Sequence, residues 1–265
     1  MIAAPAESDP SGLAPFWREV WTGADATSRN WLLYSGVTIA PWSGIHDTGW
    51  RLRFAAGYGQ YRTDGTARHL VAAGAGGGTV DVAYRSRGQI AYGDVLVGYL
   101  WRLGALTAKA FVGASIIDHR TLVAEQSATV LGPNGIPFGL EVALEGGEVG
   151  LKTALELWLN LGSNAWSSLD LNWTSAHETY SARLRAAWRA WPTVSLGVEG
   201  ILNGNGQQTL GRFASDLELG QLERRAGLFL RYEWFGGEVS LAGGLSVSPG
   251  DSARPYATLN WITQF

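Results

Sequence analysis

Apolar and polar residues alternate along most of this chain with a period of two, the period of a β-strand that has one apolar face. Segment 223–235, ERRAGLFLRYEWF, is an example, because every second residue from Ala226 to Trp234 is apolar. The pattern predicts twelve strands, at residues 18–26, 31–41, 49–61, 88–102, 104–117, 148–160, 165–175, 178–190, 192–203, 223–235, 237–247 and 254–265. Most are longer than the roughly 5–6 residues usual in soluble sheets and reach the about 9–11 residues of a tilted transmembrane strand.

The connections between these segments differ in length from one side to the other. Short ones lie around 42–48, 103, 161–164, 191 and 236, and three long ones, rich in Gly, Asn and Gln, lie near 62–87, 118–147 and 204–222. Two further connections, at 27–30 and 176–177, are short but fall on the long-loop side. An even number of strands with short turns at one end is typical of outer-membrane barrels. We therefore predict an all-β, antiparallel up-and-down transmembrane β-barrel of about 12 strands over residues 18–265.

The N-terminal residues 1–17 do not share this pattern. The start, MIAAPAESDPSG, has no basic region and no apolar core, so it is not a full signal peptide. We interpret residues 1–17 as a disordered lead-in or the remnant of a leader, and the location as the bacterial outer membrane.

Composition narrows the classes of protein. Only 16% of residues are charged, with 36 glycines and 13 tryptophans, and no apolar run is long enough for a transmembrane helix. The tryptophans lie mostly near segment ends, where interfacial aromatic girdles are expected. No cysteine is present, which excludes disulfides and thiolate sites, and a net charge of −3 without a basic block argues against nucleic acid as a partner. A soluble two-sheet sandwich stays the alternative fold, although it requires neither uniform strands nor one-sided loops.

In a barrel, the polar strand faces line the lumen. The predicted lumen-lining charged residues are the cations Arg51, Arg53, Arg102, Lys109, Lys152, Arg183, Arg185, Arg189, Arg225 and Arg231, and the acids Asp94, Glu156, Asp170, Glu199, Glu233 and Glu238. The cations are in excess, which suits a narrow path that prefers anions. The same residues could instead pair across strands and hold a small barrel shut.

Other candidate sites are few. We find no catalytic or metal-binding motif and predict no cofactor. His177, beside Ser175 in TSAHETYS, is compatible with an outer-membrane lipid hydrolase, but a polar turn residue explains it more simply. The inward aromatics Tyr92, Phe111, Trp158 and Phe229 are candidates for stacking on sugars, or else they fill the lumen.

The chain ends within its last predicted strand, PYATLNWITQF. A closed barrel requires this strand to pair with the first one, near residues 19–26. Leu259 and Trp261 would face lipid, and Phe265 would lie at the periplasmic rim. Together they form the expected insertion signal for the barrel assembly machinery.

Several stretches resemble one protein family. They are LYSGVTIAPWSGIHDTGWRLR and GYGQYR at 33–62, LTAKAFVG and IDHR at 106–120, LELWLN at 155–160, TYSARLRAAWR and PTVSLG at 179–197, and RAGLFLRYEWFGGEVSLAGG with PYATLNWITQF towards the end. Together they are similar to the alphaproteobacterial cellulose biosynthesis protein BcsS family, from Trp21 to the C-terminus. The resemblance supplies no catalytic residues.

This resemblance implies an outer-membrane protein for the biosynthesis, export or surface assembly of cellulose, as a small pore or scaffold and not an enzyme. Its implied partners are outer-membrane lipid, cellulose export components and a glucan chain. A general small-solute channel that prefers anions is the alternative, and a lipid hydrolase is the third.

Overall fold

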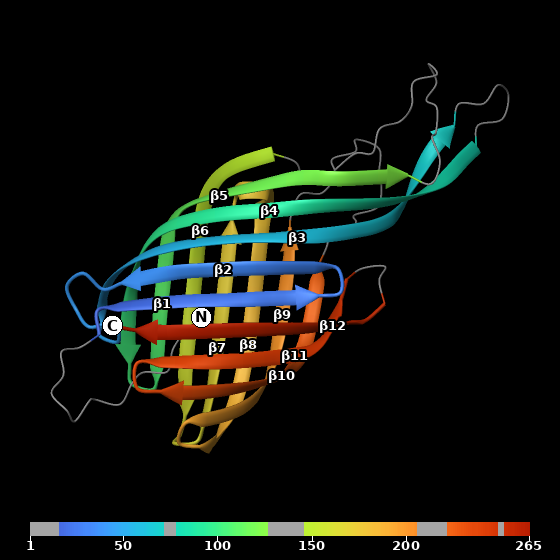
Figure 1. Ribbon diagram of the computed structural model, residues 1–265. Helices are drawn as coiled ribbons and strands as arrows, with labels where there is room; N and C mark the ends of the chain where they lie inside the picture. Colours follow the sequence, from blue (N-terminus) through green and yellow to red (C-terminus); the bar gives the residue numbers. More distant parts are fainter. Residues whose placement is uncertain (1–15, 72–77, 127–145, 206–221, 249–251) are drawn as a thin grey trace.

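The computed structural model describes residues 16–71, 78–126, 146–205, 222–248 and 252–265, without the side chains of 63–84, 121, 123–126 and 205. Within them the chain forms twelve strands and one short 3₁₀ turn (Figure 1). These are β1 (Arg18–Thr27), β2 (Asn30–Ile39), β3 (Gly49–Val71), β4 (Gly78–Leu103), β5 (Leu106–Gln126), β6 (Gly146–Leu161), β7 (Ala165–Thr174), η1 (Ala176–Glu178), β8 (Thr179–Trp191), β9 (Val194–Asn205), β10 (Glu223–Trp234), β11 (Gly237–Val247) and β12 (Arg254–Gln264).

The strands form one closed antiparallel barrel in which each pairs with its neighbours in sequence, which confirms the predicted fold. The first and last strands close it, with Glu19 opposite Gln264 and Thr27 opposite Tyr256. Phe265 continues this ladder, because its carbonyl accepts hydrogen bonds from the Trp17 and Arg18 amides. Closure removes every free strand edge within the wall, as a lipid environment requires.

The two ends of the barrel differ. Tight connections join β2 to β3, β4 to β5, β6 to β7, β8 to β9 and β10 to β11 at one end, which we call the short-turn end. Three of these turns contain a glycine with positive φ: Gly104 at 64°, Gly162 at 76° and Gly236 at 77°. Glycine adopts this conformation at no steric cost, so it allows the immediate chain reversal. We call the opposite end the long-loop end.

Two predicted loops are partly strand, which corrects their assignment. Segment 62–87 was expected to be a loop, but β3 and β4 stay paired from Tyr61 opposite Gly88 to Val71 opposite Gly78. Strand β5 likewise continues to Gln126, well into the predicted loop 118–147. In Figure 1 these three strands rise past the ends of the other strands as a ribbon. The ribbon extends beyond the barrel wall.

The outer surface of the barrel is apolar. Side chains such as Val149 and Leu228 are 70% and 69% exposed, and the outward positions of β2 to β12 all carry exposed large apolar side chains. A soluble monomer does not expose apolar surface on this scale, so the outer face is the lipid-contacting face. Among the described residues, no helix has the length and apolar character needed to span a bilayer.

Aromatic side chains form two outward girdles. At the short-turn end the girdle includes Trp50, Trp101, Trp188, Trp191 and Trp261, and at the long-loop end it includes Trp31, Tyr58, Trp173 and Tyr180. This arrangement matches the aromatic belts at the two membrane interfaces. Trp166 departs from the expected girdle position, because its side chain is 1% exposed and points into the lumen.

Candidate functional site: the lumen

The lumen near the short-turn end is crossed by an aromatic stack. Trp158 on β6 stacks on Trp166 on β7, with ring centroids 4.1 Å apart and planes inclined by 21°. Arg231 comes from β10, four strands away from β6, and its guanidinium lies 4.7 Å and 5.1 Å from the two indole centroids. Arg231 also pairs with Glu238 and lies 2.6 Å from Glu233. These contacts link β6 and β7 to β10 through the lumen, and the cation is attracted to both desolvated indole rings.

A second cross-lumen contact joins β3 to β6. Arg53 donates hydrogen bonds to Glu156 through its two terminal nitrogens, Nη1 and Nη2, and Lys109 lies 3.9 Å from the same carboxylate. The Arg53 guanidinium also lies 3.8 Å from the Phe111 ring centroid. All three charged side chains are at most 7% exposed. Such buried charges are tolerated because each has an opposite charge within contact.

The connection between β2 and β3 folds over the short-turn end. Arg51 donates hydrogen bonds to the carbonyl groups of Gly44, Ile45 and Asp47, and its side chain is fully buried. His46, in the same turn, lies 2.9 Å from Gln264 Oε1 of the last strand. Burial lowers the pKa of His46 from its usual value. The connection between β2 and β3 is therefore held by Arg51 over the short-turn end of the lumen.

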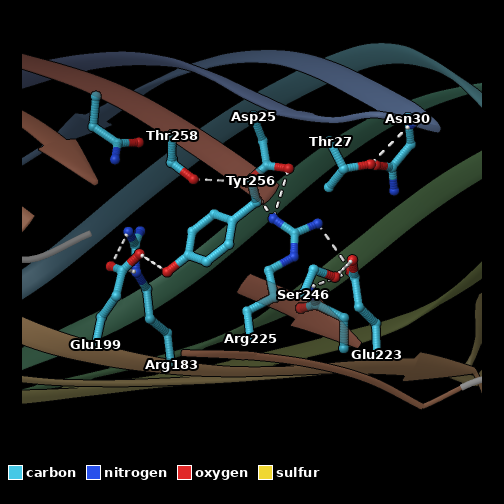
Figure 2. Close-up of polar contacts among 12 residues, drawn as sticks. Asp25, Thr27, Asn30, Arg183, Glu199, Glu223, Arg225, Ser246, Tyr256 and Thr258 are labelled. Carbon is cyan, nitrogen blue, oxygen red and sulfur yellow. Dashed lines mark hydrogen bonds and ion pairs between the residues drawn. The ribbon is translucent and has the colours of Figure 1, made fainter. Parts of the chain in front are cut away.

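The long-loop half of the lumen carries a polar network, shown in Figure 2. Arg225 on β10 donates to both oxygens of Asp25 on β1, at 2.7 and 2.6 Å, and to Glu223 at 2.9 Å. Thr258 donates to Asp25 at 2.9 Å, and Ser246 donates to Glu223 at 2.6 Å. The network connects β1, β10, β11 and β12, and leaves Asp25 and Glu223 partly exposed.

Glu199 on β9 organises the neighbouring wall. It accepts hydrogen bonds from Arg183 at 2.6 Å, Arg185 at 2.9 Å and the Tyr256 hydroxyl at 2.9 Å. Figure 2 shows Tyr256 between this cluster and the Arg225 network. Asp170 on β7 lies opposite Arg183 on β8 in the strand register. Arginine suits this role, because its planar fork can serve carboxylates on several strands at once.

Two further lumen cations complete the set. Lys152 donates to Asp94, whose other oxygen accepts from Ser115 at 2.6 Å. Arg189 donates to Asn160 Oδ1 at 3.1 Å and to the Ser163 carbonyl at 3.2 Å. Every predicted lumen cation except Arg102 therefore lies on the inward face with a partner in the described structure.

Arg102 is exposed at the short-turn rim, which corrects its assignment to the lumen. Five inward charged residues were missed. They are the acids Glu19, 1% exposed beside Gln264, Asp25, Glu223 and Glu148, and the cation Arg254 on the inward face of β12. Removing Arg102 and adding these five leaves ten cations and ten carboxylates among the residues that the structure describes. The predicted excess of positive charge is therefore absent from this corrected set, and with it the main argument for anion preference.

The four predicted sugar-stacking aromatics differ in access. Phe111, Trp158 and Phe229 are at most 4% exposed, and a guanidinium lies against each ring. Tyr92 alone stays partly exposed, in the long-loop half. Two other inward tyrosines with the same partial exposure, Tyr34 and Tyr61, were not singled out in the sequence.

His177 lies inside the mouth of the lumen and does not face lipid. Its ring meets His119 edge to face at 4.8 Å, and its Nδ1 lies 3.4 Å from Glu148 Oε2. The turn is strained, because His177 and Glu178 both have positive φ, 49° and 46°. Gly150 permits the turn to enter, since a Cβ there would lie 2.3 Å from the Ala176 amide nitrogen. Ser175 accepts a hydrogen bond from the Leu151 amide and is not paired with the imidazole in the described contacts.

In the described part of the chain, no group of three or more His, Asp and Glu side chains is arranged to hold a metal ion. The candidate site is therefore a lumen lined by ion pairs, with an aromatic stack towards the short-turn end and a polar network towards the long-loop end.

Comparison with known proteins identifies the family of this barrel. The model of the family described as cellulose biosynthesis protein BcsS matches residues 20–250. The chain belongs to the BcsS family. This assignment and the barrel fold make it an outer-membrane-type barrel of cellulose biosynthesis. No curated protein matches the chain in sequence.

Solved structures similar to this BcsS-family barrel are outer-membrane proteins. The TodX deltaS2S3 mutant, a monoaromatic hydrocarbon channel, has a TM-score of 0.50 and 10% identity over 95% of this chain and 90% of its own. The KdgM porin has a TM-score of 0.45 and 9% identity over 93% and 99% of the two chains. LpxR from Salmonella typhimurium has a TM-score of 0.47 and 12% identity over 93% and 100%. At these identities the likeness concerns the fold alone.

Proposed function

We propose that this barrel acts in cellulose export or surface assembly as a non-enzymatic scaffold, and not as an open channel. The observation that carries the proposal is the set of contacts that cross the short-turn half of the lumen. Arg231 reaches the Trp158–Trp166 stack across four strands, and Arg53 reaches Glu156 across three. A water-filled porin lumen would instead leave such charges to the solvent.

The orientation follows from the usual construction of bacterial barrels. Short turns face the periplasm and longer loops face outward. The half that carries the aromatic stack and the turn 41–48 would then lie at the periplasmic side, and the half that carries the Arg225 network would face the exterior. A nascent glucan would meet the polar, tyrosine-bearing half of the barrel outside the cell.

Three measurements test the proposal. Deletion of the gene should abolish or strongly reduce surface cellulose, and the wild-type gene should restore it. The purified full chain in planar bilayers should give no steady conductance. Discrete conductance steps that change on Arg183→Glu or Arg231→Glu would favour the pore and overturn the scaffold. Hydrolysis of outer-membrane lipid that is lost in His177→Ala would overturn the non-enzymatic assignment.

A further inference from the structure

We propose that the outer wall of β3, β4 and β5 carries a binding site for the phosphate groups of an outer-leaflet glycolipid. The site lies just beyond the aromatic girdle of the long-loop end, and its binding residues are Arg62, Arg87 and Arg120. It takes its side of the membrane from the usual outward orientation of long loops. It concerns the lipid-facing side of the barrel and does not depend on the role proposed for the lumen.

The three arginines share one outward face. Arg62 continues the outward row of β3 that contains Tyr58, and it lies directly opposite Arg87 on β4. Arg120 on β5 lies opposite Gln89, the outward position of β4 that precedes this level by two residues. Side chains directly opposite each other start about 5 Å apart, and diagonal neighbours about 7–8 Å apart. All three arginines are exposed, so their charged groups are within reach of one lipid headgroup.

The pairing of Arg62 with Arg87 places two like charges side by side. Among the described residues, no hydrogen bond or ion pair of either guanidinium offsets this repulsion. Like charges at directly opposite positions destabilise a strand pair. A phosphate between the two guanidinium groups would remove the repulsion, because each planar fork can donate two hydrogen bonds to phosphate oxygens.

Arg120 adds to the positive charge of this face, and Arg85 does not clearly do so. Arg120 binds Asp118 through Nε at 2.7 Å, and its side chain is still 66% exposed. Arg85, two residues beyond Arg87, lies opposite Asp64 and Glu125 in the two strand ladders, so it is left out of the site. The site therefore consists of three cations and one carboxylate, with a net charge that attracts an anion.

The arginines lie at the level of the lipid headgroups. Trp31 packs against Tyr58 edge to face at 5.7 Å, and the Tyr58 hydroxyl donates to Gln89 at 3.0 Å. Trp31 lies opposite Gln60, and Arg62 follows two residues later, about 7 Å along the strand. Aromatic girdles mark the edge of the hydrocarbon layer, and the headgroup layer outside it is about 5–8 Å thick. This position is that of the phosphate groups of a membrane lipid.

The positive charge is confined to one side of the barrel. Outside this wall, Arg224 on β10 is the single exposed outward cation on a described strand at the long-loop end. Its register neighbours are the apolar Leu202 and Val247. A general attraction to an anionic membrane surface would not require three arginines on adjacent strands. The clustering favours one lipid molecule held at a defined place, with its acyl chains along the apolar wall below.

Binding of lipid A, a glycolipid with two phosphate groups, tests the proposal. The full chain in a neutral detergent is titrated with lipid A, and the bound lipid is counted by native mass spectrometry. We expect saturable binding of one molecule to the wild type. Arg62→Gln and Arg87→Gln should each weaken the affinity about tenfold or more, because each removes a charge-assisted pair of hydrogen bonds. Heat-modifiable gel mobility verifies that each variant is folded.

Arg224→Gln is the matched control, because it removes an exposed outward arginine at the same end without touching the site. It should bind lipid A as the wild type does. A second readout is the thermal unfolding midpoint in detergent. Added lipid A should raise this midpoint for the wild type and for Arg224→Gln, since a ligand of the folded state stabilises it. The double variant Arg62→Gln/Arg87→Gln should lose this shift.

Several outcomes overturn the proposal. They are an absence of saturable binding by the wild type, unchanged affinity in the Arg62 and Arg87 variants, and an equal loss in Arg224→Gln. Equally tight binding of dephosphorylated lipid A would show that phosphate is not recognised. Displacement of lipid A by an equal concentration of inorganic phosphate would assign the site to a free ion. Equally tight binding of phosphatidylglycerol or of an oligogalacturonate would reject the outer-leaflet glycolipid as the ligand.

Discussion

The Arg53–Glu156–Lys109 cluster gives a sharp prediction about stability. Removing one member of a buried ion pair costs about 3–5 kcal/mol, because the partner stays buried and uncompensated. After Arg53→Met, Glu156 keeps Lys109 at 3.9 Å, an attraction of about 4 kcal/mol before desolvation at an effective dielectric constant of about 20. We therefore expect Arg53→Met to lower the free energy of unfolding by about 3 kcal/mol. Glu156→Gln removes the carboxylate that both cations contact, so it should lower the free energy of unfolding by about 5 kcal/mol.

The assay is urea unfolding of the refolded barrel in lipid vesicles, followed by fluorescence of its 13 tryptophans. Arg102→Met is the matched control, because Arg102 is exposed at the rim and its loss should change the unfolding free energy by less than about 0.5 kcal/mol. The reasoning is refuted if Glu156→Gln costs no more than Arg53→Met, or if both stay within the range of the control.

Three further perturbations follow from the structure. Gly57→Ala brings a methyl group to 2.3 Å from the Tyr92 ring, so it should lower the free energy of unfolding by about 1–3 kcal/mol and with it the urea midpoint. In the control Gly93→Ala the nearest atom lies at 3.7 Å, so the urea midpoint should stay unchanged. Burial lowers the pKa of His46, so the folded state binds the proton less readily than the unfolded state. The contribution of His46 to stability is complete above about pH 6.5 and is lost as the pH falls below that value. His46→Gln should therefore flatten the pH dependence of thermal unfolding, and an unchanged pH dependence would contradict this reasoning. Phe265→Ala should reduce the folded barrel in outer-membrane fractions several-fold, measured by heat-modifiable mobility, and an unchanged yield would rule out the assembly signal.

The strands within the membrane were predictable because lipid imposes a period of two. Each outward position must be apolar, so the alternation records both the strand and the direction of each side chain. The same physics explains the error at β3, β4 and β5. Where the ribbon extends beyond the wall, lipid no longer requires an apolar outer face, so a period of two could not identify these residues as strand.

The pairing inside the lumen was less predictable. Strand parity could have identified Trp166 as inward, since it shares a face with Ser168 and Asp170, but its place near a strand end suggested a girdle. Contacts such as Arg225 with Asp25 depend on the stagger accumulated across the closed barrel. No local pattern encodes that stagger, so the charges were predictable and their partners were not.

The ribbon makes the mouth of the barrel asymmetric. Strand β2 pairs with β3 only as far as Tyr61, and β3 continues for ten residues to Val71. At about 3.3 Å per residue, this raises one side of the mouth by roughly 30 Å of continuous backbone. The tall side is formed by β3, β4 and β5, and the inward Tyr61 and Tyr92 lie on β3 and β4. If the proposed scaffold role holds, a glucan chain at this mouth would lie beside a wall of paired backbone on the side of β3, β4 and β5.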